Sequence, residues 1–274
     1  MRLIIALVPE AKPLIELYNL KRLDGDLMFP IYQNGNLFLV ISGIGQLNSS
    51  AATAYLHAKS GELQNQPFLN IGIAGHPHLM LGTAIIANRI TDGSIGKNWY
   101  PPQTVFDSLN RTTLITVKTV EQKYETDAAY DMEAYGYYSS ALKSTSSELA
   151  QSLKVISDNL NNSSRALNSK RIENLIRDRI DEIDGFVKTL QRLSESITNH
   201  QTEPYDLESF FGRWHFTVTQ RHQLRKLIRR WMLLAKDENP ITTIPRDCLN
   251  ASQAIEALET SLLARPLNLH TTDD

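Results

Sequence analysis

The chain has 274 residues, of which 42% are hydrophobic and 21% are charged, and its formal net charge is -2. These values are typical of a globular protein. They exclude a chain whose overall charge drives binding to nucleic acid or to a membrane surface. The single cysteine, Cys248, excludes an internal disulfide and a cysteine metal cluster, and it is consistent with a reducing cytosol.

The first apolar run, residues 3–8, predicts a strand that is buried on both faces. The run ends at Pro9-Glu10 without a small-residue cleavage site, which favours a strand over a signal peptide. Residues 12–20 predict a helix with Pro13 in its first turn. No segment approaches the length needed to span a bilayer, so we expect a cytoplasmic protein without a membrane partner.

A hairpin and a glycine-rich turn follow. Residues 28–33 and 37–42 predict two strands that flank the hairpin signal Asn34-Gly35. The second strand leads into Ser42-Gly43-Ile44-Gly45 and then into a helix of small residues. Such a turn can direct backbone N–H groups at a ligand, although a plain structural turn is the alternative.

Further apolar strands are predicted at residues 68–75, 81–88 and 114–120, with a long loop over residues 92–110. Strands that alternate with helices in this way predict an α/β layered fold.

The stretch over residues 118–159 begins with a strand-like run at 118–121 and continues into a helix-like run of small residues and tyrosines. It closes with a short apolar strand, residues 153–156, that leads into Ser157-Asp158. Glu133 and Asp158 both stand where a strand meets a loop or helix. Ligands of α/β proteins bind at such edges.

Beyond Asp158 the pattern becomes helical. Residues 170–197 predict one long amphipathic helix, and a polar break begins at residue 198. We therefore expect a domain over residues 1–197 and a helical C-terminal extension over residues 198–274. One extension helix carries five basic residues without an acid: Arg221, Arg225, Lys226, Arg229 and Arg230. A solvated face is favoured there over nucleic-acid or partner binding.

Four motifs follow one another along the chain, each at the end of a predicted strand. They are Ala6-Leu7-Val8-Pro9-Glu10-Ala11, Ser42-Gly43-Ile44-Gly45, Asn70-Ile71-Gly72-Ile73-Ala74-Gly75, and Asp131-Met132-Glu133 followed by Ile156-Ser157-Asp158. Together they resemble the purine/uridine phosphorylase superfamily, and most closely its methylthioadenosine/S-adenosylhomocysteine nucleosidases. This resemblance covers the first domain. It implies a three-layer α/β/α sandwich with a mixed central sheet.

The resemblance also implies roles for individual residues. Asp158 would protonate the purine leaving group, and Glu10 would hold and activate the attacking water. Met132 would pack beneath the ribose, and Glu133 would accept hydrogen bonds from its hydroxyls. The other substrate-binding positions implied are Gly43, Ile44, Gly45, Ala74, Gly75 and Ser157. We expect neither a cofactor nor a metal. We expect a homodimer, with residues 49–57 near its interface.

The residue types fit this chemistry independently. Cleavage of an N-glycosidic bond passes through a cationic sugar, so the leaving base must gain a proton while carboxylates stabilise the sugar. Structural alternatives remain for each residue. Glu10 or Asp158 can cap a helix, Glu133 can be solvated, and Met132 can belong to the core.

Two further functions stay open on the sequence. One is a phosphate-dependent phosphorylase, but Asn70 stands where the phosphorylases bring an arginine to the phosphate, which favours water as the nucleophile. The other is a non-catalytic nucleoside-sensing or interaction protein on the same fold. His76 and His78 form an H-x-H pair without an evident third metal ligand.

Overall fold

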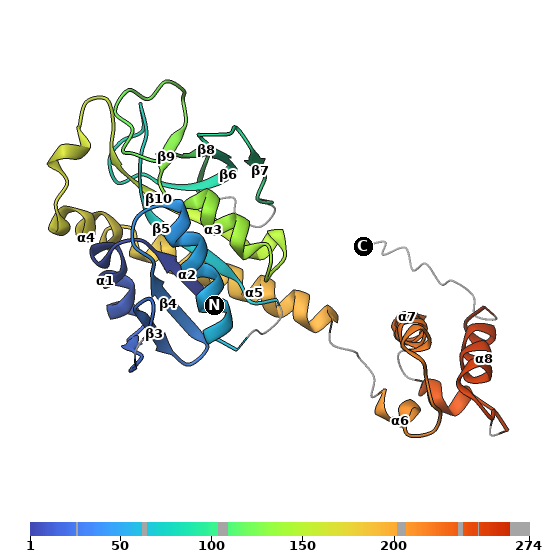
Figure 1. Ribbon diagram of the computed structural model, residues 1–274. Coiled ribbons are helices and arrows are strands. Elements are labelled where there is room, and N and C mark those ends of the chain that lie inside the picture. Colours follow the sequence, from blue (N-terminus) through green and yellow to red (C-terminus); the bar gives the residue numbers. More distant parts are fainter. Residues whose placement is uncertain are drawn as a thin grey trace, which may run out of the picture. The chain divides into compact units, whose positions relative to one another are not determined.

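The computed structural model describes residues 1–25, 27–61, 65–103, 109–201, 207–234, 238–245 and 247–263. The chain divides into two compact units, residues 1–197 and 198–274 (Figure 1). Among the described helices, none combines the length and the apolar character that crossing a membrane requires.

The first unit is built on a mixed sheet with the strand order β10-β6-β8-β9-β5-β1-β4-β3-β2, and β7 pairs with β6. The strands are β1 (Arg2–Ile5), β2 (Lys21–Arg22), β3 (Ile31–Asn34), β4 (Leu37–Ile41), β5 (Phe68–Gly75), β6 (Ala84–Asp92), β7 (Asn98–Trp99), β8 (Asn110–Thr116), β9 (Ala129–Asp131) and β10 (Ala150–Asp158). Strand β10 pairs with β5 in parallel and with β6 antiparallel. The sheet therefore closes at one end into a ring of β5, β10, β6, β8 and β9.

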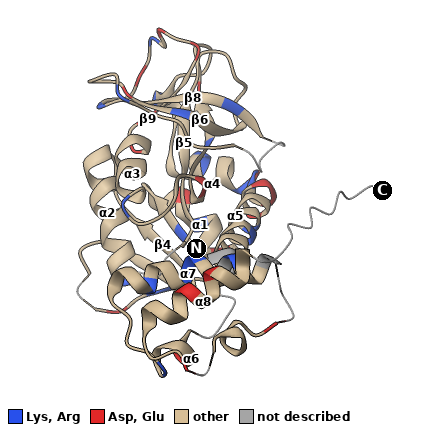
Figure 2. Ribbon diagram, turned by 90° about the vertical axis from the view of Figure 1, so that its right-hand side faces the viewer, with Lys and Arg blue, Asp and Glu red and all other residues tan. Residues whose placement is uncertain are grey.

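Helices cover both faces of the sheet and give three layers. They are α1 (Val8–Leu17), α2 (Gln46–Lys59), α3 (Ala134–Ala141), α4 (Ser169–Arg177) and α5 (Ile180–Gln201). In β1, Leu3 and Ile5 belong to the same core cluster as residues of α1, α4 and α5. Ile4 belongs to a second cluster with residues of α2 and α3. Figure 2 shows α2 and α3 on one side of the strands and α4 and α5 on the other. The predicted three-layer α/β/α sandwich with a mixed sheet is confirmed.

Several predicted element boundaries are wrong. The first helix begins at Val8 and not at residue 12, because Pro9 is accommodated in its first turn, where proline needs no N–H partner. The strand predicted at residues 153–156 spans Ala150–Asp158, so Asp158 lies within it. The run at 118–121 is not a strand, because β8 ends at Thr116.

The helix predicted over residues 170–197 is divided into two helices, α4 and α5, which are separated by Asp178 and Arg179. The Arg179 guanidinium donates to the Gly82 carbonyl oxygen at 2.6 Å, so the interruption connects the helix pair to the turn before β6. The predicted long loop over residues 92–110 contains the short strand β7, which pairs with β6.

The second unit holds α6 (Glu208–Phe211), α7 (Val218–Leu234), a 3-10 turn (Pro240–Thr243) and α8 (Ala251–Leu263). It has a hydrophobic cluster of its own, to which Phe210, Trp214 and Trp231 belong. Apolar residues of α7 are buried, including Leu224 and the fully buried Trp231. Arg221, Lys226 and Arg230 are exposed on the same helix.

Candidate active site

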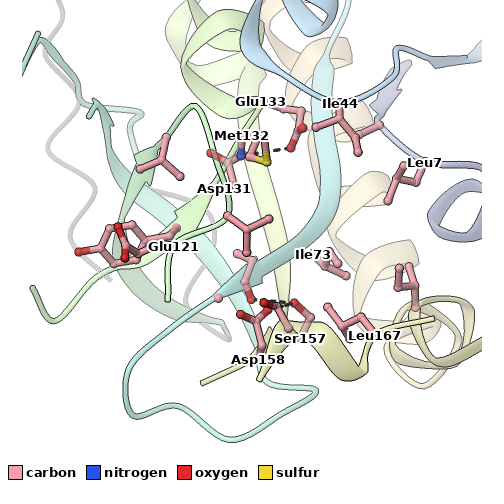
Figure 3. Close-up of a pocket in the computed structure, with 18 of the residues that line it drawn as sticks. Leu7, Ile44, Ile73, Glu121, Asp131, Met132, Glu133, Ser157, Asp158 and Leu167 are labelled. Carbon is pink, nitrogen blue, oxygen red and sulfur yellow. Dashed lines mark hydrogen bonds between the residues drawn. The ribbon is translucent and has the colours of Figure 1, made fainter. Parts of the chain in front are cut away.

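A cavity of about 410 Å³ opens where β5, β9 and β10 end and α1 begins (Figure 3). Eight of the positions singled out by the sequence line it: Glu10, Ile44, Ala74, Gly75, Met132, Glu133, Ser157 and Asp158. Gly43 and Gly45 are not among its lining residues. Segments far apart in the chain thus place the three predicted carboxyl groups around one space, together with those of Glu121 and Asp131.

Glu10 lies in the first turn of α1 and is 2% exposed. One carboxylate oxygen accepts a hydrogen bond from the Leu7 N–H at 2.8 Å. Glu10 therefore caps the helix, which is the structural role considered for it from the sequence. The other oxygen accepts from the Ile73 N–H of β5 at 2.9 Å. Burial raises the pKa of Glu10 to about 7, against the opposing effect of nearby Lys154. The same carboxyl group therefore joins α1 to β5 and titrates near neutral pH at the cavity wall.

Glu133 is the residue that precedes α3, and it is 7% exposed. It accepts from the Gly45 N–H at 2.9 Å, so the glycine-rich turn acts on the site through this carboxylate. The φ angle of Gly45 is +102°, a conformation that favours glycine. Burial raises the pKa of Glu133, and the nearby charge of Lys154 partly opposes this effect.

Lys154 is a buried cation behind the cavity that the sequence motifs do not include. Its ammonium group lies 2.9 Å from Asp131 and 3.9 Å from Glu133. Burial lowers the pKa of Lys154, but the charges of Asp131, Glu133 and Glu10 outweigh this effect and raise it. A lysine in the middle of an apolar strand is itself a signal of paired buried acids, so the sequence contained this information.

Gly72 of β5 gives this ion network its space. A Cβ atom at Gly72 would lie 2.9 Å from a Glu10 carboxylate oxygen and 3.4 Å from the Lys154 ammonium. Any larger residue would therefore displace the Glu10 carboxylate.

Both oxygens of the Asp158 carboxylate accept hydrogen bonds from hydroxyl groups. Ser157 donates to Oδ1 at 2.5 Å, and Tyr124 donates to Oδ2. Asp158 is 5% exposed and lies at the end of β10, next to Gly75 in the sheet. The contact with Tyr124 was not predicted, because it depends on how the segment between β8 and β9 folds back over the strand ends.

The rest of the cavity wall is mostly apolar and includes Leu7, Val117, Val120, Leu167 and Ile172. Of the lysines and arginines in the described part of the chain, Arg165 alone lines the cavity, and it is exposed. Asn70 does not line it, because its side chain is buried and donates to the Ile4 carbonyl oxygen at 3.1 Å.

The residues that the structure describes contain no group of three or more His, Cys, Asp or Glu that could hold a metal ion. In the H-x-H pair, His76 uses its Nδ1 to accept from the His78 and Leu79 N–H groups, and its Nε2 lies 3.6 Å from Asp127. The pair therefore shapes the turn after β5.

No protein-family model matches the sequence, and no curated protein matches it. Solved structures do. The 5′-methylthioadenosine/S-adenosylhomocysteine nucleosidase of Helicobacter pylori, bound to butyl-thio-DADMe-Immucillin-A, matches with a TM-score of 0.56 and 16% identity over 68% of this chain and 97% of its own. The Colwellia psychrerythraea 34H nucleosidase in complex with adenine gives 0.54 and 18% over 70% and 94%. Futalosine hydrolase of Helicobacter pylori strain 26695 gives 0.55 and 16% over 70% and 96%.

The chain has the nucleosidase fold. This is the fold that the resemblance of the sequence motifs implies. At these identities the likeness establishes the arrangement of strands and helices alone.

Proposed function

We propose that this chain hydrolyses the N-glycosidic bond of a purine nucleoside or nucleoside derivative. The observation that carries the proposal is the convergence of Glu10, Glu133 and Asp158 on one cavity. An apolar cavity with a few convergent polar groups and a perturbed pKa is the usual form of a small-molecule site.

Each carboxyl group has a distinct task in this reaction. As the bond between the sugar and the base breaks, its electron pair goes to the base, and Asp158 supplies the proton that neutralises it. Glu133 accepts hydrogen bonds from the ribose hydroxyls above Met132. Glu10 takes a proton from the water that attacks the sugar, for which a pKa of about 7 is well suited.

The charges around the cavity favour a cationic transition state and water as the nucleophile. Glu10, Asp131 and Glu133 surround the ammonium of Lys154, so among the described residues acids outnumber bases beside the sugar position. A phosphate dianion in the same place would face carboxylates, with Arg165 as its nearest available cation among the lining residues. We therefore favour hydrolysis over phosphorolysis.

The test is base release from a panel of purine nucleosides, with and without phosphate, by the wild type, Asp158→Asn and Glu10→Gln. Asp158→Asn should keep the fold, because the hydroxyls of Ser157 and Tyr124 can each accept from the new amide as well as donate to it. It should still bind ligand but lose base release by about 10²- to 10⁴-fold.

Other outcomes of the same assay point to different functions. A rate that requires phosphate indicates a phosphorylase. Binding without base release from any nucleoside indicates a sensing protein, and the hydrolase proposal then fails.

We also propose that the chain acts as a cytoplasmic homodimer. Leu47 at the start of α2 is 83% exposed, and Ile44 beside it is 50% exposed at the cavity rim. These apolar side chains support an interface there. Light scattering of the purified chain tests the assembly, and a monomeric mass contradicts it.

A further inference from the structure

We propose that Tyr124 is a further catalytic residue, which relays the proton between Asp158 and the leaving base. This inference rests on the proposed hydrolysis and adds a residue that none of the four sequence motifs contains.

The first observation is that the Asp158 carboxylate is enclosed by two hydroxyl groups. Ser157 occupies Oδ1 and Tyr124 occupies Oδ2, while the Tyr124 side chain also lines the cavity. A base in the cavity that approaches Oδ2 therefore meets the phenol oxygen first. A hydroxyl is both donor and acceptor, so it can stand between an acid and a base and pass a proton on.

The second observation is that the chain makes room for this contact. A Cβ atom on Gly75 would lie 2.9 Å from Asp158 Oδ2 and would collide with the Tyr124 hydroxyl. Glycine at position 75 is thus what allows the phenol to reach the carboxylate. Gly75 also pairs with Tyr130, whose ring meets the Tyr124 ring edge-on at 5.6 Å between centroids.

The third observation is the backbone of Tyr124. Its φ angle is +48°, a left-handed conformation that a bulky residue rarely adopts. Strain of this kind persists where surrounding contacts over-determine it, and it concentrates at functional sites. Here the tight turn is held by Glu121, whose carboxylate accepts from the Gln122 and Lys123 N–H groups at 2.8 Å each. The turn aims the phenol at Asp158.

Protons and electrons balance in this relay. In the structure the phenol donates to Asp158 Oδ2. In the reactive state the Asp158 carboxyl group carries a proton, so this hydrogen bond reverses: Asp158 donates to the Tyr124 oxygen, and the phenol hydrogen is free to face the base. When the glycosidic bond breaks, its electron pair moves to the base. A ring nitrogen of the base takes the phenol proton, and the Tyr124 oxygen takes the Asp158 proton. Asp158 ends as a carboxylate, and Glu10 holds the proton from the attacking water, which returns to Asp158 through solvent.

The electrostatics suit a relay in which the phenol stays neutral. Burial, together with the hydrogen bond to Asp158, raises the pKa of Tyr124 well above its usual value. The phenol therefore releases its proton only as it receives another.

The test compares two substrates in Tyr124→Phe. A purine riboside has a leaving group that needs a proton, whereas 4-nitrophenyl riboside releases an anion that is stable without one. We expect Tyr124→Phe to lower purine release by about 100-fold or more and to leave nitrophenol release within about threefold of the wild type. Tyr18→Phe is the matched control, because Tyr18 also donates to an aspartate, Asp184, but lies outside the cavity. It should change neither rate.

Nitrophenol release also reports that the variant is folded. The relay is overturned if Tyr124→Phe keeps or increases purine release, since the phenol is then only a plug that the base displaces. It is equally overturned if both substrates slow by the same factor, which indicates a structural role. If the wild type cleaves neither substrate, the proposed hydrolysis itself fails and the relay fails with it. Loss of purine release in Asp158→Asn but not in Tyr124→Phe leaves the hydrolysis standing and removes the relay alone.

Discussion

Glu10 combines a structural and a chemical role in one side chain. It caps α1 through the Leu7 N–H and holds β5 through the Ile73 N–H, while it faces the cavity. The capping interpretation and the proposed catalytic role are therefore compatible, since the same hydrogen bonds that cap the helix hold the carboxylate at the cavity wall. The cost of this arrangement is a buried charge, which becomes visible in the pH dependence of stability.

We predict that stability conferred through Glu10 falls as the pH rises. The pKa of Glu10 is raised by burial from 4.5 in the unfolded chain to about 7 in the fold, so between these values the native state binds the additional proton. That contribution is complete below pH 4.5, is lost as the pH passes through 7, and amounts to about 3 kcal/mol at most.

Urea unfolding of the wild type and Glu10→Gln at several pH values measures this effect. Between pH 5 and pH 8 the unfolding free energy of the wild type should fall relative to that of Glu10→Gln. The rate of base release by the wild type should rise over the same range. Parallel pH profiles for the two proteins would contradict the prediction.

We predict that Lys154→Met destabilises the fold by about 3–5 kcal/mol. The substitution removes a buried cation from a group of acids that includes Asp131 and Glu133. Lys12→Met is the matched control, because Lys12 pairs with Glu173 at 3.1 Å while the Lys12 side chain is 52% exposed, so water screens its charge and its loss should cost much less. Chemical denaturation measures both, and equal losses would show that burial does not matter here.

At the scale of helices, the crossing of α2 and α3 is fixed by a single glycine. A Cβ atom on Gly136 would lie 2.6 Å from the Gln46 carbonyl carbon, so the two backbones touch. Gln46 follows Gly45, which donates to Glu133. The packing of two helices thus sets the position of a carboxylate in the cavity.

We predict that Gly136→Ala destabilises the protein by about 1–3 kcal/mol and weakens nucleoside binding, because α2 must move away from α3 and takes the Gly45 N–H with it. Gly185→Ala is the control. Gly185 lies within α5, and a Cβ atom there would have nothing within 4 Å, so alanine should stabilise the helix by about 0.5–1 kcal/mol. Thermal unfolding and ligand titration measure the pair, and a stable, fully binding Gly136→Ala would contradict the argument.

The strands and the three carboxylates could be predicted from the sequence, because buried parallel strands are continuous apolar runs and each carboxylate stands in a short motif at a strand end. The starts of helices were harder to predict. Pro9 suggests an end to structure, yet it lies inside the first turn of α1. The contact of Tyr124 with Asp158 could not be predicted from the sequence. It depends on the left-handed backbone conformation of Tyr124 and on the single pairing of Gly75 with Tyr130. Both are consequences of tertiary closure.

At the scale of the whole chain, each unit has its own hydrophobic core, and Trp231 belongs to that of the second unit. We predict that Trp231→Ala destabilises the second unit by about 3–5 kcal/mol while base release and nucleoside binding stay unchanged. Calorimetry should show one transition shifted to lower temperature and the other preserved. Loss of nucleoside binding in this variant would show that the first unit depends on the second.

The closed ring of strands also bears on how such a site can change over time. Strands β8 and β9 are direct neighbours, with Thr116 paired to Asp131, so the ends of the segment over residues 117–128 are held together by the sheet itself. That segment supplies Val117, Val120, Glu121, Gln122 and Tyr124 to the cavity wall, whereas Glu10 and Glu133 come from other parts of the chain. The segment can therefore be replaced as a unit without rearranging the strands on either side of it. Exchanging it would alter which leaving group is accepted while the machinery for the sugar stays in place.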